Sequence, residues 1–352
     1  MLHLIFPLLI ALNSAKYTDW AKLRVNATES AYLDATAELH KELFQNRYYR
    51  KELSPVYSKQ PSNLTQTSYP RFNVEIELAF IKLFEINAQS QTVTMGLEFM
   101  QFWVDPRLSW LPEEYDGIEV IWLGFDTVWI PEYSVFDVSA ITEAWPDYRR
   151  PVRVQSTGLV YLDTQQVVTI SCPMDLGKFP FDSQICPILF GLASYWVNQI
   201  TSNGTLFDFD YKSMSGNGEW TVENISLTAY QVPSKTMPQD VLCFEMYVKR
   251  EPNFYIYVIV LPTFLLTFLS VTGMFWTPNT KDEQLTKMSI GLTSMMSMTI
   301  FVQMVSEQIP RTVTFPLLGI FVIVCVAIVS CACVVLIMFS TKRKEKEQKT
   351  DK

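Results

Sequence analysis

The stretch that decides the fold is Cys172–Cys186, CPMDLGKFPFDSQIC. Its two cysteines are separated by thirteen residues, and its middle is the apolar run Phe179-Pro180-Phe181, followed by Asp182. The chain of 352 residues holds six cysteines, so two of them around one short apolar loop need an explanation. Whether this pair can form a disulfide depends on the compartment in which the chain folds.

The N-terminal part of the chain carries two kinds of export signal. Residues 1–15, MLHLIFPLLIALNSA, combine an apolar run with small residues before a cleavage point, which predicts a signal peptide rather than a buried first strand or helix. Glycosylation sequons precede residue 253 and none follows it; they begin at Asn26, Asn63, Asn203 and Asn224. These features predict an oxidising compartment, where Cys172 and Cys186 can close their loop while Cys243 stays unpaired.

Three uncharged stretches follow the soluble part, which covers residues 16–252. They span residues 253–276, 288–306 and 312–341, and each is long enough for a helix to cross a bilayer core of about 30 Å. The tail, residues 342–352, is rich in Lys and Arg and is therefore predicted to be cytoplasmic. Three crossings then place the N-terminal domain outside the cell, in a multi-pass protein of the plasma membrane.

The soluble part alternates apolar and polar residues over short runs, for example LVYLDTQQVVTIS at residues 159–171. Turn-forming sequences such as Ser215-Gly216-Asn217-Gly218 recur between these runs. Many short strands joined by turns predict a β-sandwich, and the segment 20–43, richer in Ala and Glu, predicts a short helix before it. The expected fold is an extracellular all-β sandwich with a short N-terminal helix, followed by an α-helical transmembrane bundle.

The second uncharged stretch has an unusual number of hydroxyl side chains for a helix that faces lipid. One helical face carries hydroxyls at its cytoplasmic end, apolar residues in its middle and an acid at its outer end: Ser289, Thr293, Met296, Ile300, Gln303 and Glu307. A ring of such helices could line an ion pore, with Met296 and Ile300 closing it and Glu307 attracting cations. The alternative is a buried helix that packs through its small polar residues, and the composition of the stretch leaves both interpretations open.

Other classes of function have little support in the sequence. It contains no metal-ligand cluster, no Gly-rich phosphate loop and no paired nucleophile and base, so we expect neither an enzyme nor a cofactor or metal site. Cys325, Cys331 and Cys333 lie in an apolar run and are expected to pack as small core residues. The formal net charge is −8, which favours no nucleic-acid partner. An acidic outer domain would concentrate cations, although solubility alone can explain it.

The opening stretch resembles the signature of the Cys-loop receptors, the pentameric neurotransmitter-gated ion channels. The similarity extends to WVDPRLSW at residues 103–110, VWIPEYSVFD at residues 128–137 and EQIPRT at residues 307–312. The resemblance implies a homo- or hetero-pentamer in the postsynaptic membrane. It also implies that a small-molecule neurotransmitter binds between neighbouring subunits.

The family resemblance implies that the disulfide loop lies at the membrane end of the sandwich. Its tip, Phe179, Pro180 and Phe181, would press on the link that follows the pore helix and so pass force to it. The residues implied for this coupling zone are Glu85, Phe179, Pro180, Phe181, Asp182, Arg250, Pro310 and Arg311. Arg250 is expected to pair with Glu85 or Asp182, because a guanidinium there needs a partner. A disulfide that merely stabilises a long loop is the alternative.

The ligand site and the ion selectivity depart in part from the family pattern. Receptors for amines surround a cation with aromatic rings, and the matching positions here are Phe136, Tyr195, Trp196, Tyr230, Glu98 and Phe99. Glu98 stands where an aromatic residue is common, and for each aromatic the alternative is core packing. Asp282, Glu283 and Glu307 favour a cation channel, whereas the order Gly291-Leu292-Thr293-Ser294 is similar to anion channels.

The family has a fourth membrane helix after a cytoplasmic loop, whereas this sequence ends at Lys352. The expectation is a subunit without that helix, or an incomplete sequence. We therefore expect a subunit of an extracellular ligand-gated channel, with cations favoured over anions. The alternative is a non-conducting, membrane-tethered regulatory or dominant-negative subunit of such channels.

Overall fold

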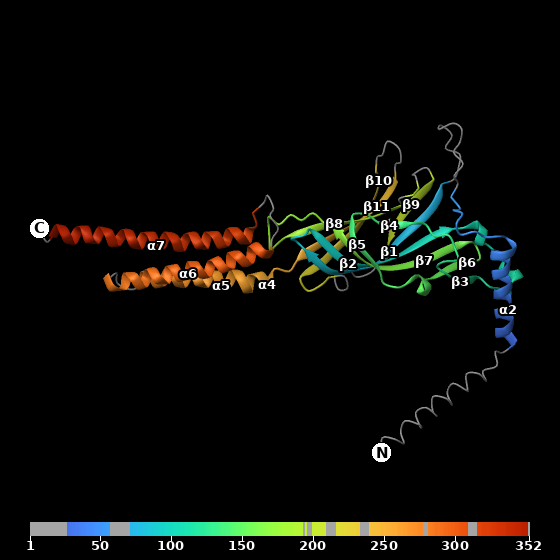
Figure 1. The fold of residues 1–352 in the computed structure, drawn as a ribbon, viewed down its shortest axis with the longest axis horizontal. Coiled ribbons are helices and arrows are strands. Elements are labelled where there is room, and N and C mark those ends of the chain that lie inside the picture. Colours follow the sequence, from blue (N-terminus) through green and yellow to red (C-terminus); the bar gives the residue numbers. More distant parts are fainter. Residues whose placement is uncertain are drawn as a thin grey trace, which may run out of the picture. The chain divides into compact units, whose positions relative to one another are not determined.

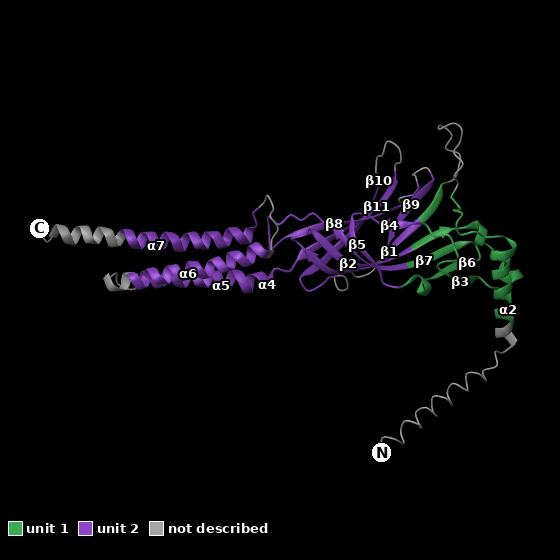
Figure 2. Cartoon of the chain, in the orientation of Figure 1, with its two compact units in different colours: residues 1–74, 101–131, 146–163 green, residues 75–100, 132–145, 164–352 purple. Residues whose placement is uncertain are grey.

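The computed structural model describes residues 27–56, 71–192, 194–195, 199–208, 216–232, 239–276, 281–308 and 315–350. The chain divides into two compact units (Figure 2). Unit 1 consists of residues 1–74, 101–131 and 146–163, and unit 2 of residues 75–100, 132–145 and 164–352. The predicted signal peptide and the sequons at Asn26 and Asn63 lie outside the described residues.

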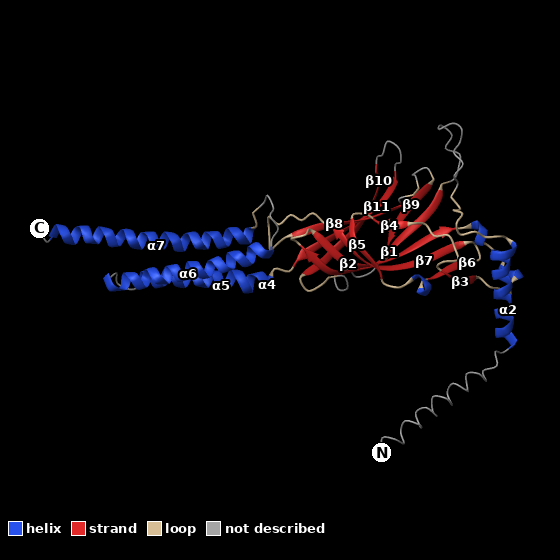
Figure 3. Cartoon of the chain, in the orientation of Figure 1, coloured by secondary structure: helices blue, strands red, loops and turns tan. Residues whose placement is uncertain are grey.

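The helix α2 precedes the strands and long helices follow them, which confirms the predicted fold class (Figure 3). The strands are β1 Phe72–Asn87, β2 Thr92–Val104, β3 Val120–Gly124, β4 Tyr133–Val135, β5 Val138–Glu143, β6 Pro151–Gln155, β7 Leu159–Ser171, β8 Ser183–Leu192, β9 Ile200–Leu206, β10 Trp220–Val232 and β11 Gln239–Arg250. The helices are α2 Ala27–Lys41, α4 Asn253–Tyr255, α5 Leu261–Trp276, α6 Lys281–Gln308 and α7 Leu317–Thr350 (Figure 1). Shorter helical segments are η2 Glu42–Asn46, η3 Pro106–Leu108, η4 Pro112–Glu114, η5 Asp147–Arg149 and η6 Ile256–Val260.

The strands form two sheets, which confirms the predicted β-sandwich. One sheet has the strand order β3-β6-β7-β2-β1-β9, with β5 paired to β7, and the other has the order β10-β11-β8-β4. In the second sheet β11 runs antiparallel to β8, with Met246 opposite Cys186 and Lys249 opposite Ser183. This pairing places the end of β11 beside the end of the disulfide loop.

Unit 1 is organised around the buried carboxylate of Asp105, in the WVDPRLSW stretch. Asp105 is fully buried and accepts hydrogen bonds from Arg107 Nη2 at 2.7 Å and from the Tyr49 hydroxyl at 3.1 Å. The hydrogen bond to Asp105 raises the pKa of Arg107, and burial raises the pKa of Tyr49. The hydrogen bonds from the Tyr49 hydroxyl to Asp105 and from Arg107 Nη1 to the carbonyl of Leu53, at 2.8 Å, fasten the segment after α2 to the loop after β2, which gives this stretch a structural role.

The core of unit 2 follows the period of two that strands impose. On β2 the odd-numbered residues Val93, Met95, Leu97 and Phe99 are buried, while the residues between them are partly exposed. They belong to one apolar cluster with residues of β8, β11 and the disulfide loop. Tyr255, Ile259 and Leu318 join the same cluster, so its packing continues from the sandwich into the first and last long helical segments.

Among the residues that the structure describes, three helices are long and apolar enough to cross a membrane: Asn253–Trp276, Leu285–Glu307 and Leu317–Met338. The first matches the prediction. Helix α6 begins at Lys281 and not at Met288, and α7 begins at Leu317 and continues to Thr350 through the basic segment. The prediction followed uncharged stretches, whereas backbone hydrogen bonds extend a helix through charged residues as well. The amide of Ile320 donates to the carbonyl of Pro316 and so sets the first turn of α7.

Helices α5, α6 and α7 lie alongside one another and share an apolar cluster (Figure 1). Ser270 of α5 and Ser294 of α6 are joined by a hydrogen bond of 2.6 Å between their hydroxyls. Gly291 of α6 packs so closely on α7 that a Cβ atom there would lie 2.4 Å from Cys333 Sγ. Small residues thus allow close contact between these helices, as is usual in membrane bundles.

Candidate functional site

The disulfide between Cys172 and Cys186 is present, which confirms the predicted pair. Cys172 directly follows β7, and Cys186 lies within β8. Between them, Phe179 and Pro180 are buried, whereas the Phe181 side chain is 54% exposed. The expected apolar tip is therefore divided, with two residues packed inward and one facing out.

The buried part of the disulfide loop contacts two helical segments. The ring of Phe179 meets the ring of Tyr255 edge-on, with centroids 4.7 Å apart. The carbonyl of Phe179 accepts a hydrogen bond of 3.1 Å from the amide of Leu318, the second residue of α7. The loop was expected to press on the link after the pore helix, but residues 309–314, including Pro310 and Arg311, lie outside the described residues.

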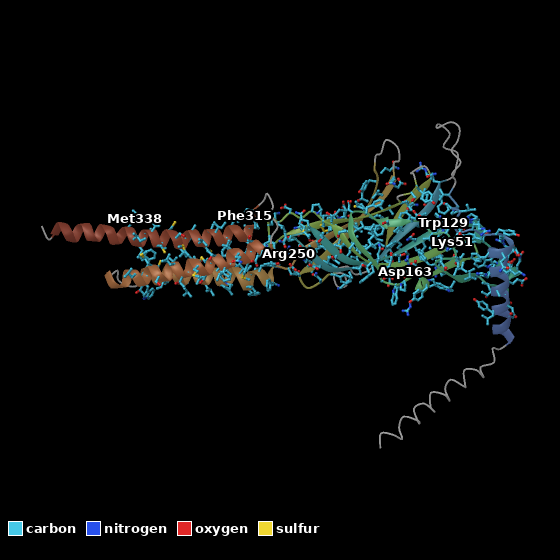
Figure 4. The ribbon with its side chains drawn as sticks, viewed as in Figure 1. Lys51, Trp129, Asp163, Arg250, Phe315 and Met338 are labelled. Carbon is cyan, nitrogen blue, oxygen red and sulfur yellow. A yellow bond between two sulfur atoms is a disulfide. The ribbon has the colours of Figure 1, made fainter. Side chains whose placement is uncertain are left out.

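Arg250 is the last residue of β11 and only 4% exposed. Its Nε lies 2.9 Å from Asp182 Oδ1, and its Nη1 donates to Glu219 Oε1. Figure 4 shows Arg250 where the strand-rich part of unit 2 joins the helices. Of the two expected partners, Asp182 is confirmed. Glu85, the alternative partner, lies exposed on β1, and Glu219 contributes the second carboxylate.

Aromatic rings complete the surroundings of Arg250. Its guanidinium carbon lies 4.1 Å from the ring centre of Trp220, 4.8 Å from that of Phe179 and 5.7 Å from that of Tyr255. Ring faces attract a cation that has lost its water, and two carboxylates supply the counter-charge that a buried guanidinium needs. The disulfide loop, β10, β11 and α4 therefore converge on one charged side chain.

The structure exposes the helical face of α6 that the sequence analysis singled out. Every member of that face is exposed in the subunit: Ser289, Thr293, Met296, Ile300, Gln303 and Glu307. The opposite face is buried, and it carries Lys287, Gly291, Ser294, Met298 and Val305. Gln303 donates to Glu307 at 3.0 Å along the exposed face. The side chains of Asp282 and Glu283 lie outside the described residues.

Two of the aromatics expected at the ligand site belong to opposite edges of the second sheet, since Tyr230 lies on β10 and Phe136 directly follows β4. Phe136 is half-buried and covers Gly191, where a Cβ would be 2.4 Å from the ring. Tyr230 of β10 is 42% exposed, and its pKa is raised by burial and by the charges of Cys243 and Asp137. Tyr195 is half-buried, and Trp196 lies outside the described residues.

Tyr133, which the sequence analysis did not single out, belongs to the same region. Its hydroxyl forms a hydrogen bond with Ser202, and burial raises its pKa. Tyr133 is on β4 and Ser202 on β9, so this contact ties the two sheets together. A tyrosine within VWIPEYSVFD gave no sequence signal that separated it from its aromatic neighbours.

On β2 the structure separates Glu98 from Phe99. Phe99 is 1% exposed, and its ring centre lies 5.0 Å from that of Phe190 in the core, which favours the alternative of core packing for this residue. Glu98 faces outward, where it accepts a hydrogen bond of 3.0 Å from Gln165, and Gln165 accepts one of 2.9 Å from Trp145. Of the expected glycosylation sites, Asn203 and Asn224 have exposed side chains, and their modification stays a prediction.

Comparison with known proteins relates this chain to one family of ion channels. Residues 36–252 match the model of the neurotransmitter-gated ion-channel ligand binding domain, and residues 259–352 match that of the neurotransmitter-gated ion-channel transmembrane region. The proton-gated ion channel subunit pbo-6 of Caenorhabditis elegans is 27% identical over 242 residues, which cover 69% of this chain and 57% of the relative. The human neuronal acetylcholine receptor subunit alpha-9 is 28% identical over 312 residues, covering 88% of this chain and 61% of the relative.

The acetylcholine receptor subunit alpha-type des-2 of Caenorhabditis elegans is 27% identical over 286 residues, covering 77% of this chain and 50% of the relative. This chain thus spans about half to three fifths of the length of these curated relatives. The family consists of membrane-embedded ligand-gated channels with an extracellular ligand-binding domain, and its members are not enzymes. Because the two family models together match most of its residues, the chain belongs to the neurotransmitter-gated ion-channel family, the Cys-loop receptors.

Proposed function

We propose that this chain is a subunit of a homo- or hetero-pentameric cation channel in the postsynaptic plasma membrane, opened by an extracellular neurotransmitter. The observation that carries the proposal is the two-faced burial of α6. The face from Ser289 to Glu307 is exposed, and the face through Gly291 and Met298 is packed against the other helices. A membrane helix that exposes hydroxyls and an acid needs a polar surrounding, because lipid cannot solvate them.

A ring of five such helices would supply that surrounding as a water-filled pore. Ser289 and Thr293 would replace part of an ion's hydration shell near the inner end. Met296 and Ile300, which are 73% and 58% exposed in the subunit, would form an apolar constriction. Glu307 at the outer end, with Asp282 and Glu283 before the inner end, would favour cations over anions.

The ligand we propose is a small cation, held between neighbouring subunits. Phe136, Tyr195, Trp196 and Tyr230 would offer aromatic rings from one subunit. Glu98 would face them from the next subunit and add a carboxylate. Support comes from the partial exposure of Phe136, Tyr230 and Glu98. It also comes from relatives whose names specify acetylcholine receptor subunits.

The test combines voltage clamp with cysteine substitution, in cells that express the chain alone or with a family partner. Thr293→Cys and Ile300→Cys should make agonist-evoked current sensitive to a charged thiol reagent. Met298→Cys, on the buried face of the same helix, is the matched control and should stay insensitive. Replacing Na⁺ should shift the reversal potential, whereas replacing Cl⁻ should not. Silence of the chain alone, with suppression of a partner's current despite surface expression, would support the non-conducting alternative.

A further inference from the structure

We propose that Glu219 is the positioning residue through which Arg250 is coupled to the first membrane helix. This inference rests on the proposed channel function. The sequence showed no signal for Glu219. Of the two alternative partners expected for Arg250, Asp182 pairs with it and Glu85 lies exposed on β1. We infer that the ion pair between Glu219 and Arg250 can break and form again, while the ion pair between Asp182 and Arg250 stays intact.

The two carboxylates that pair with Arg250 are held in different ways. Asp182 is 1% exposed and also accepts a hydrogen bond of 2.8 Å from Gln184. The backbone carbonyl of Asp182 accepts a further bond from the Arg250 amide at 3.1 Å. The Glu219 side chain is 47% exposed. Because water can replace the partners of Glu219 but not those of Asp182, Glu219 can release Arg250 at a lower cost.

Glu219 also contacts both sides of the junction between sandwich and helices. Its Oε1 accepts from Arg250 Nη1 and, at 3.2 Å, from the hydroxyl of Tyr255 at the end of α4. Its backbone is fixed, since its carbonyl accepts a hydrogen bond of 2.8 Å from the amide of Glu251. A single carboxylate oxygen therefore bridges the last residue of β11 and the first helical segment, and it reinforces the direct hydrogen bond of 3.4 Å from Arg250 Nη1 to the Tyr255 hydroxyl.

Removing the charge of Glu219 would affect both contacts. Arg250 would remain buried with one counter-charge in place of two, and Tyr255 would face an amide and not a carboxylate. Movement of the sandwich would then be passed less effectively to the first helix. The chain provides a matched control in Glu223 of β10, which pairs with Lys249 at 3.8 Å and is exposed, as is its partner. An exposed pair of this kind contributes little.

The experiment compares Glu219→Gln, Glu223→Gln and Tyr255→Phe in cells that express the chain with a family partner. Surface labelling normalises the amount of protein. Glu219→Gln should raise the agonist concentration for half-maximal current by about fivefold, and Glu223→Gln should change it by less than about twofold. Glu219 and Tyr255 share one contact. The double variant Glu219→Gln/Tyr255→Phe should therefore need no higher agonist concentration for half-maximal current than the more strongly affected single variant. Equal shifts for Glu219→Gln and Glu223→Gln, or additive shifts in the double variant, would overturn the proposal.

A second readout does not need ion conduction. Phe181 is exposed and adjoins Asp182, so Phe181→Cys can report on the junction by its rate of labelling with a thiol reagent. Adding Glu219→Gln should change that rate by about threefold or more, and adding Glu223→Gln should not. If no current is seen but this difference persists, the proposed function fails and the role of Glu219 stands. Identical labelling rates would refute the role of Glu219 even in a conducting channel.

Discussion

The amide of Leu318 donates a hydrogen bond of 3.1 Å to the carbonyl of Phe179. The ring of the same phenylalanine packs against Tyr255 and under the guanidinium of Arg250. The disulfide loop therefore holds the start of α7 through its backbone and the start of the first membrane span through a side chain. The loop is apolar because its buried residues form part of the packing between the sandwich and the helices.

Phe179→Ala should destabilise this junction by about 3 to 5 kcal/mol, because it leaves a cavity where a buried ring was. Phe181→Ala is the matched control, since its ring is 54% exposed, and it should change stability by less than about 0.5 kcal/mol. Thermal unfolding of the full chain in detergent measures both variants. Equal midpoints for the two variants would contradict the placement of Phe179 in the core.

Gly291→Ala should destabilise the helix bundle by about 1 to 3 kcal/mol, because its Cβ would lie 2.4 Å from Cys333 Sγ. Gly273→Ala is the control on α5, where a Cβ meets nothing within 4 Å, and it should leave stability unchanged or raise it by up to about 1 kcal/mol. Adding Cys333→Ala should restore part of the loss at Gly291. A Gly291→Ala variant as stable as the parent would show that α6 and α7 are farther apart than described.

Tyr133→Phe should change how stability depends on pH. Burial raises the pKa of Tyr133 in the folded state, so its neutral phenol contributes stability that is fully present below about pH 10, the pKa of an unfolded tyrosine. That contribution is lost at about 1.4 kcal/mol for each pH unit as the pH rises toward the folded pKa. Tyr133→Phe removes this dependence and also loses the hydrogen bond to Ser202.

Thermal unfolding of parent and Tyr133→Phe between about pH 8 and pH 11 checks this prediction. The parent should lose more stability than the variant over the alkaline half of the range. Part of the loss should persist in the variant, because burial raises the pKa of Tyr49 as well. Parallel curves would mean that the Tyr133 phenol is accessible to solvent.

The sequence predicted the features that depend on repeating patterns. The alternation along β2 and β7 indicated strands, and the uncharged stretches located three helices, with errors only at their ends. The same alternation could have favoured core packing for Phe99. One face of β2 carries Val93, Met95, Leu97 and Phe99. Because the first three are apolar, the alternation predicts that Phe99 also faces the core and that Glu98 faces out.

Glu219 could not have been found in this way. A single glutamate just after the turn sequence Ser215-Gly216-Asn217-Gly218 has no periodic signal, and its partner Arg250 lies 31 residues further along the chain. Their contact depends on the pairing of β10 with β11, which places Trp220 opposite Arg250. Contacts set by strand register become visible only once the register is known.

Ile300→Ser and Met296→Ser should produce a leak current without agonist, because a hydroxyl in the proposed apolar constriction would allow water to remain there. Both residues lie on the exposed face of α6. Val302→Ser is the matched control, since Val302 is 38% exposed but lies two residues beyond Ile300, so it points about 200° away around the helix. Resting current at equal surface expression measures the effect. A leak in Val302→Ser as large as in Ile300→Ser would indicate a general loosening of the bundle. The constriction would then have to lie elsewhere along α6.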